Sequence, residues 1–170
     1  AELGITGPYL IYAGTASEWQ GADIFASALE QVRRTHPTAQ ILYIGQGSDW
    51  QKIAQVASAL PPGPDGAPAV VMHGLMDASD AARWQRGAAA SLVSIRPGQG
   101  YDFAYPTKVL AALACGVPVV YAGVGPVIED LTAHDLGWEA DYTEDDVARA
   151  MTRALDEADR IAAQDTSRAR

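Results

Sequence analysis

Short apolar runs alternate with helix-like segments along this chain, and this alternation limits the possible folds more than any other feature. The five clearest runs end at or beside a glycine or proline and cover residues 9–14, 39–47, 69–74, 90–97 and 117–123. Because they are apolar on both faces, they are typical of parallel strands buried inside a layered fold. A weaker edge strand is expected at 136–140.

The segments between these runs place apolar residues three or four positions apart, which is the spacing of one helix face. Helices are predicted within residues 18–36, 49–60, 77–89, 106–115 and 125–134. A last helix is expected from about Thr143, and residues 164–170 are expected to fray. The proline- and glycine-rich stretch 61–68 is predicted to be a loop.

Strands that alternate with helices predict an α/β fold with a doubly wound, Rossmann-like parallel sheet. Right-handed crossovers place helices on both faces of such a sheet and give three layers. We expect about six strands in the order 3-2-1-4-5-6, with residues 9–13 at the centre. The chain has 170 residues, enough for one core, and residues 1–165 are assigned to a single domain.

Charge and cysteine content exclude several classes of partner and site. The net charge is −9, so nucleic acid and anionic lipid are not expected as partners. The single cysteine, Cys115, excludes an internal disulfide and is expected to be a small buried packing residue. Neither it nor the three scattered histidines has the spacing of a metal site, so no metal or cofactor is expected.

The chain shows no membrane span and no signal peptide. No apolar stretch approaches the roughly 20 residues that cross a bilayer. The first residues, "AELGITGPYLIYAG", have no charged segment before an apolar core, as a signal peptide would. They are interpreted as a linker within a longer polypeptide.

Ligands of doubly wound folds bind at the carboxyl ends of the strands, near the point where the strand order reverses. Here the strand ends are Gly14 and Thr15, Gly45 to Gly47, His73 and Gly74, and the loop from Arg96 to Tyr105. Neither glycine-rich turn has the pattern of a nicotinamide or ATP site, because GxGxxG and GK[ST] are both missing. Each turn taken alone is equally compatible with a plain connection.

Lys108 occupies an unusual position for a cation. It follows Pro106 and Thr107 on the first turn of the helix predicted at 106–115, where a positive charge opposes the helix dipole. Free N–H groups and a lysine together form a site for an anion, above all a phosphate. The alternative is a solvated surface lysine, and its position alone favours neither interpretation.

Four segments, in order, carry a family resemblance. They are "YLIYAGTASEWQGAD", "ILYIGQGSDWQKI", "VVMHGLMDASD" and "YPTKVLAALACGVPVV". Their order resembles the C-terminal, nucleotide-sugar-binding domain of GT-B glycosyltransferases of the family-4 type. The likeness runs from Tyr9 to about Leu155, and "LACGVPVV" is its most specific part.

The resemblance implies the donor-binding half of an enzyme that transfers a sugar from a nucleoside-diphosphate sugar, with retention and without a metal. The acceptor would bind an N-terminal domain of the same polypeptide that is absent from this chain. A cytoplasmic protein is implied, which the missing domain could bring to the inner face of the membrane. Catalytic residues are left open. The implied donor-binding residues are Gly14, Thr15, Gly45, Gly47, His73, Gly74, Leu75, Tyr105, Thr107 and Lys108.

Several positions depart from the family pattern. Thr15 and Gln20 stand where many members have an arginine and a lysine, and Phe103 and Ala111 stand where they have paired glutamates. The second of those glutamates usually holds the ribose. Lys108 is then the surviving cation for a diphosphate. Two alternatives stay open: a degenerate, non-catalytic binding module, and another nucleotide-binding domain such as a sugar epimerase half or a flavodoxin-like protein.

Overall fold

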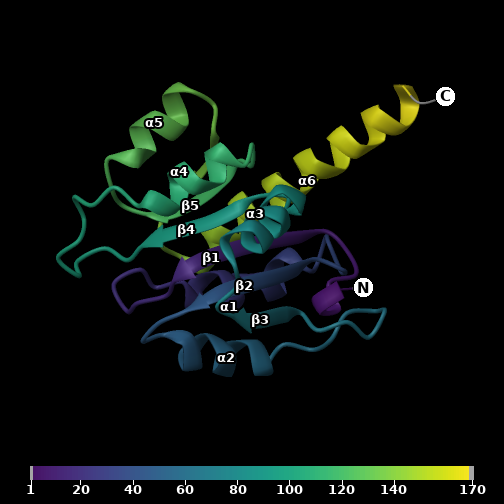
Figure 1. Cartoon of the computed structure of the whole chain (residues 1–170), viewed down its shortest axis with the longest axis horizontal. Helices are drawn as coiled ribbons and strands as arrows, with labels where there is room; N and C mark the ends of the chain where they lie inside the picture. The colour runs from purple at the N-terminus through teal and green to yellow at the C-terminus, as the bar shows by residue number, and fades with distance from the viewer. Residues whose placement is uncertain (1, 169–170) are drawn as a thin grey trace.

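All strands of the computed structural model, which describes residues 2–168, run parallel in one six-stranded sheet (Figure 1). The strands are β1 (Tyr9–Thr15), β2 (Gln40–Gln46), β3 (Val70–Gly74), β4 (Ser91–Ile95), β5 (Val119–Gly123) and β6 (Gly137–Ala140). Their order, β3-β2-β1-β4-β5-β6, confirms the predicted order and places β1 inside the sheet. The fold is therefore the predicted Rossmann-like one.

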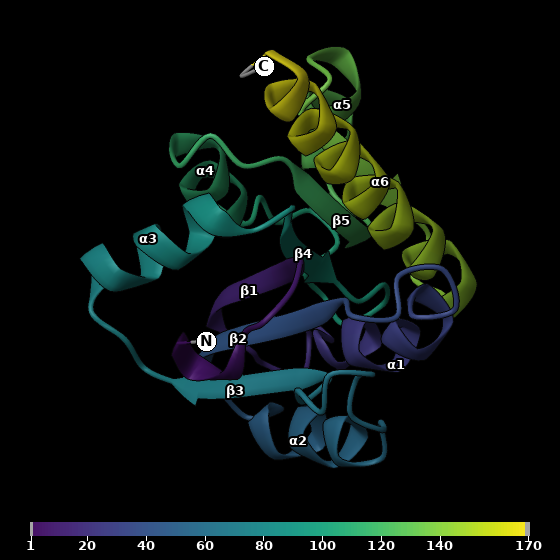
Figure 2. The same cartoon turned by 90° about the vertical axis from the view of Figure 1, so that its right-hand side faces the viewer.

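Helices cover both faces of this sheet. A short 3-10 turn, η1 (Glu2–Gly4), precedes β1, and the helices are α1 (Asp23–Val32), α2 (Trp50–Ser58), α3 (Ala78–Gly87), α4 (Thr107–Ala114), α5 (Val127–Ala133) and α6 (Glu144–Arg168). The helices α1, α2 and α6 pack on one face, while α3, α4 and α5 pack on the other (Figure 2). This arrangement gives the three predicted layers.

Each strand is a continuous run of apolar residues because its alternate side chains pack into cores on opposite faces of the sheet. In β1, Leu10 and Tyr12 face α1 and α6, whereas Tyr9 and Ile11 face α3. In β5, Tyr121 joins a third cluster under α4 and α5.

The ladder between β1 and β4 is the point where the strand order reverses. β1 pairs with β2 along its whole length, from Tyr9 to Thr15. Its pairing with β4 is confined to Ile11 opposite Ser91. Beyond that pair the carboxyl halves of β1 and β4 form no ladder, which leaves space there for a side chain from a neighbouring element.

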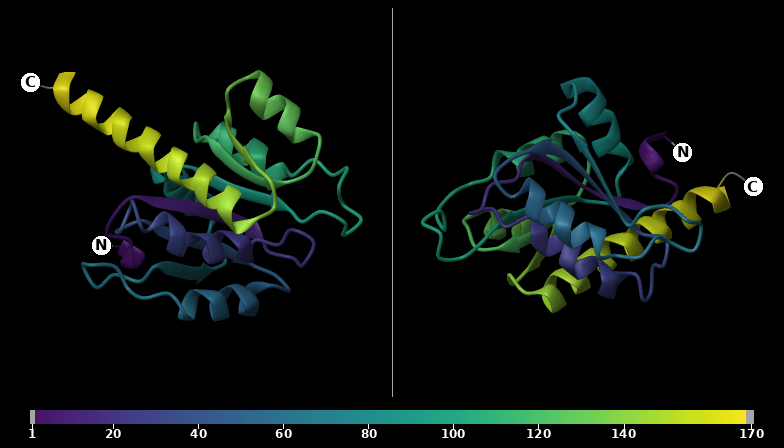
Figure 3. Two further views of the ribbon diagram at one scale, coloured as in Figure 1. Left: turned by 180° about the vertical axis from the view of Figure 1, so that it is seen from behind. Right: turned by 90° about the horizontal axis from the view of Figure 1, so that it is seen from below.

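The end of the chain differs from its prediction. Residues 164–168 were expected to fray, yet α6 continues to Arg168 and extends past the sheet (Figure 3). The last buried residue of α6 is Leu155, so packing does not hold this part. Local hydrogen bonds and pairs such as Arg160 with Glu157 at 2.6 Å support it instead. Residues 169–170 lie outside the described part.

Candidate functional site

A cavity of about 350 Å³ opens at the carboxyl edge of the sheet, beside the gap between β1 and β4. Gly14 and Gly45 form its floor at the ends of β1 and β2, and Leu75 and Met76 border it after β3. Small side chains of α3 line the cavity, and so do Ala111 of α4 and Cys115, which directly follows that helix. The cavity therefore lies where ligands of doubly wound folds bind.

The glycines at these strand ends are required by close contacts of the backbone. Gly45 has φ +140°, and a Cβ there would overlap the carbonyl oxygen of Gly14. Gly47 has φ +152°, and its Cβ would overlap the carbonyl oxygen of Ala16. The backbone therefore approaches closely at this turn, because only glycine fits both the φ values and the contacts.

Lys108 extends from α4 across the gap between β1 and β4. A Cβ on Gly14 would lie 2.7 Å from Cε of Lys108, so the lysine stem passes directly over that glycine. The ammonium lies 5.5 Å from the centre of the Tyr12 ring. Lys108 thus points to the strand end where the anion site was predicted, and does not lie on an outer helix face.

The ammonium of Lys108 has no counter-charge in the described part of the chain. No carboxylate of residues 2–168 lies within 4.0 Å of it. Burial lowers the pKa of Lys108 to about 8, since desolvation disfavours the charged form. A half-buried cation without a partner is the arrangement that gains most from an incoming anion.

Tyr12 contacts the Lys108 ammonium with the face of its ring and supplies no negative charge. Its hydroxyl donates a hydrogen bond to the carbonyl of Thr15 at 2.7 Å. Burial, and then the nearby charge of Asp49, raises the pKa of Tyr12, so the phenol stays neutral. The carboxylate of Asp49 is itself buried, and its Oδ2 has no hydrogen-bond partner among the residues described.

The loop between β1 and α1 is fixed by its carbonyl groups. Each carbonyl oxygen from Trp19 to Ala22 accepts a hydrogen bond from a different residue. In chain order the donors are the Arg96 N–H (2.9 Å), Ser94 Oγ (2.5 Å), the Tyr142 hydroxyl (2.6 Å) and the Tyr43 hydroxyl (2.7 Å). These contacts hold the loop rigidly beside the strand end that carries Gly14.

Sequence reasoning did not find these donors. The available signal was the presence of Tyr43 and Tyr142 in otherwise buried segments, because a buried tyrosine hydroxyl usually has a hydrogen-bond partner.

Gln20 and Arg96 also belong to this support and not to the cavity wall. The buried side chain of Gln20 accepts a hydrogen bond from the Ser17 N–H at 2.7 Å, so it braces the loop. The Arg96 guanidinium lies 3.3 Å from Asp23, which also pairs with Lys52 at 3.4 Å. Lys108 is therefore the cation of this edge whose charge is left free within residues 2–168.

The other predicted donor-binding residues are placed as follows. Thr15 and His73 are exposed at strand ends, Gly74 faces open space, and Thr107 is exposed as the first residue of α4. Leu75 is 70% exposed at the mouth of the cavity. The Tyr105 hydroxyl donates to Asp130 of α5 at 2.9 Å, which directs it away from β1. The structure thus brings together Gly14, Gly45, Leu75 and Lys108.

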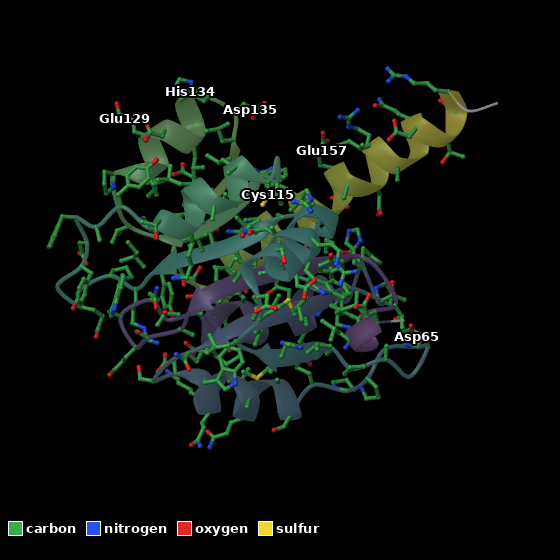
Figure 4. The ribbon with its side chains drawn as sticks, in the orientation of Figure 1. Asp65, Cys115, Glu129, His134, Asp135 and Glu157 are labelled. Carbon is green, nitrogen blue, oxygen red and sulfur yellow. The ribbon has the colours of Figure 1, made fainter. Side chains whose placement is uncertain are left out.

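Three residues in α4 and the segments beside it have side chains whose polarity or exposure affects the site. Ala111 lines the cavity without a polar group, and Phe103 is 80% exposed. Cys115, predicted to be buried, is instead half-buried and lines the cavity at the end of α4, where Figure 4 labels it. Cys115 directly follows the last residue of α4, and its thiol lies 3.9 Å from Oε1 of Gln85 on α3.

No group of three or more His, Cys, Asp and Glu side chains in residues 2–168 could hold a metal ion. No helix in that part of the chain has the length and apolar character needed to cross a membrane.

Three solved structures with a similar fold are glycosyltransferases. The lipopolysaccharide outer core galactosyltransferase WaaB has a TM-score of 0.68 and 19% identity, over 90% of this chain and 41% of that one. HepE of Anabaena, solved with UDP and glucose, has a TM-score of 0.72 and 17% identity, over 93% and 41%. The catalytic domain of the Helicobacter pylori cholesterol-α-glucosyltransferase has a TM-score of 0.69 and 12% identity, over 90% and 89%.

These identities establish the fold alone, and the chain spans about two fifths of the length of WaaB and HepE. No curated protein matches the chain by sequence. A family model described as glycosyl transferases group 1 matches residues 7–157, which is most of the chain. This match decides against an epimerase half or a flavodoxin-like protein. The chain belongs to the group 1 glycosyl transferases.

Proposed function

We propose that this chain is the donor-binding domain of a glycosyltransferase that uses a nucleoside-diphosphate sugar. The observation that carries the proposal is Lys108 at the gap between β1 and β4, a half-buried ammonium with no carboxylate of residues 2–168 within 4.0 Å. Phosphate is the natural counter-ion for such a group at the first turn of a helix. The adjoining cavity of about 350 Å³ offers apolar walls for the nucleoside.

In this arrangement each part of the donor has its own place. The nucleoside lies against Leu75 and the alanines of α3, and the diphosphate lies between Gly14 and the first turn of α4. The sugar then extends toward the loop before α4, which carries Phe103. When the sugar leaves, negative charge develops on the diphosphate, and the Lys108 ammonium with the free N–H groups of α4 stabilises it.

The remaining parts of the reaction are assigned to a longer polypeptide. An N-terminal domain of that polypeptide would bind the acceptor and supply the groups on the opposite wall of the cleft. We expect transfer with retention of the anomeric configuration, as the resemblance implies. Purified residues 1–170 should transfer no sugar, because one wall of the cleft positions only one of the two substrates.

A second function is supported by Ala111 and Phe103. Both lack a carboxylate at positions where the family pattern has one, and Ala111 lies on the cavity wall itself. A domain that kept the fold but lost sugar transfer would serve as a binding module of the whole protein.

Calorimetric titration with UDP, GDP and their nucleosides tests the proposal. A donor-binding domain should bind one diphosphate more tightly than the matching nucleoside, because the nucleoside lacks the charge that Lys108 receives. A binding module that has lost the donor would show no saturable heat with any of the four. In that case the donor-binding proposal is rejected and the module interpretation stands.

A further inference from the structure

A second hollow, of about 400 Å³, lies on the other face of the sheet between α1 and α6. The two helices lie side by side on that face (Figure 3). Three arginines line the hollow: Arg34, which follows α1, and Arg149 and Arg153 of α6. We call this hollow the arginine groove. Because α1 runs from the carboxyl edge of the sheet to its amino edge, Arg34 lies at the edge opposite the donor site.

The charge of the arginine groove is opposite to that of the molecule. The chain has 21 acidic and 12 basic residues, yet the lining of this groove includes three arginines and no Asp or Glu. Its other polar side chains are Gln31, Thr35 and Thr152, which can all donate hydrogen bonds. Three arginines therefore border a hollow whose lining carries no negative charge.

Among the residues that the structure describes, two of the three guanidinium groups lack an ionic partner. Within residues 2–168 no carboxylate lies within 4.0 Å of Arg34 or Arg153, whereas Arg149 pairs with Asp146. The hydroxyl of Thr152 also makes no hydrogen bond in this part of the chain, unlike the hydroxyl of Thr166 on the same helix. The groove therefore keeps two free cations and a free donor.

The acidic side chains around the groove lie outside its lining. Glu30, four residues before Arg34, borders a separate hollow together with that arginine. Asp156, one turn further along α6, lies 2.8 Å from Nε2 of His36, and Asp159 lies 3.8 Å from Nδ1 of that ring. Glu157, which Figure 4 labels on α6, pairs with Arg160 of the same helix. Glu139 and Asp146 line a separate hollow on the far side of Arg149 and Arg153. None of these carboxylates lines the groove.

We propose that the arginine groove binds a phosphate group. A guanidinium presents paired N–H donors that match two phosphate oxygens. Arg34, which follows α1, and Arg153 of α6 line the groove from two different segments. The chain repels anionic surfaces over long distances because its net charge is −9, so binding depends on these local contacts. The phosphate belongs either to a soluble phosphorylated compound or to the headgroup of a lipid.

The test must separate this groove from the donor site, so every protein carries Lys108→Met. Pyrophosphate is titrated into this background protein and into variants that add Arg34→Gln, Arg153→Gln or Arg86→Gln. Arg86, on α3, is exposed and lines neither hollow, and its substitution changes the net charge equally. Backbone NMR spectra report the site of binding at Thr35 and Thr152 and confirm that each variant is folded.

We expect Arg34→Gln and Arg153→Gln each to weaken pyrophosphate binding about tenfold, and Arg86→Gln to leave it unchanged. Equal affinities in all variants, or no saturable binding in the millimolar range to the background protein, would overturn the proposal. If the proposed donor site binds no diphosphate, this result is unaffected, because every protein in the test already lacks Lys108.

Flotation with vesicles identifies the source of the phosphate. Vesicles of phosphatidylcholine with phosphatidic acid are compared with vesicles of phosphatidylcholine alone. Retention only by phosphatidic acid, lost in Arg153→Gln, assigns a lipid headgroup. Pyrophosphate binding without such retention assigns a soluble phosphorylated compound.

Discussion

Replacing Lys108 with methionine removes the charge and keeps the stem that packs over Gly14 and the Tyr12 ring. A charged hydrogen bond to phosphate contributes about 1.5–3 kcal/mol, so UDP or GDP should bind roughly 10- to 150-fold more weakly to the variant. The matching nucleoside should bind both proteins equally. Lys52→Met is the matched control, because Lys52 is the other lysine of the chain and already pairs with Asp23.

The same lysine predicts how binding depends on pH. Burial lowers the pKa of Lys108 to about 8, so the ammonium is charged at pH 7 and mostly neutral at pH 9. Between these values the affinity of the wild-type protein for the diphosphate should fall about tenfold. The affinity of Lys108→Met should not change, apart from the ionisation of the base, which the nucleoside titration measures.

Stability should respond in the opposite direction. The pKa of Lys108 is lower in the folded protein than its ordinary value of 10.5, so the unfolded chain holds the proton more tightly. Below about pH 8 the buried charge is present and destabilises the fold, and this cost disappears as pH rises toward 10.5. At pH 7 Lys108→Met should be more stable by roughly 1–3 kcal/mol in urea unfolding.

Equal diphosphate affinity in wild type and Lys108→Met would refute the proposed role of the lysine. A variant less stable than wild type at pH 7 would refute the account of its burial. The two measurements are independent, because the first concerns the ligand and the second concerns the free protein.

Three further outcomes follow from the site. Alkylation of Cys115, the sole cysteine, should slow when the nucleoside fills the cavity and should stay fast with pyrophosphate. Mass spectrometry measures the alkylation rate, and slowing by pyrophosphate but not by the nucleoside would contradict this prediction. Tyr142→Phe removes the hydroxyl donor from the carbonyl of Gly21, which then keeps the Ile24 N–H at 3.3 Å. The free energy of unfolding should fall by about 1–2 kcal/mol, with unchanged stability as the contrary result. Gly14→Ala places a Cβ 2.7 Å from Cε of Lys108, so the diphosphate titration should show the loss expected for Lys108→Met, and wild-type affinity would contradict the contact.

The sequence by itself determined the fold class and the strand order. The alternation of apolar runs with helical spacing is a local signal, and right-handed crossovers leave few ways to arrange such units. The position of Lys108 on the first turn of α4 was also visible, because Pro106 and Gly116 bracket that helix. The length of α6 could not be predicted, because its last turns lack the apolar pattern that identified its first half.

Only the tertiary structure decided what the site residues contact. The sequence gives no means to see that the Lys108 stem crosses Gly14, that Gln20 turns back to Ser17, or that the Cys115 thiol reaches the cavity. Tyr142 supports Gly21 from 121 positions away. Periodicity along the chain reports which face of an element is buried, whereas the contacts of a polar side chain depend on packing between segments that are distant in sequence.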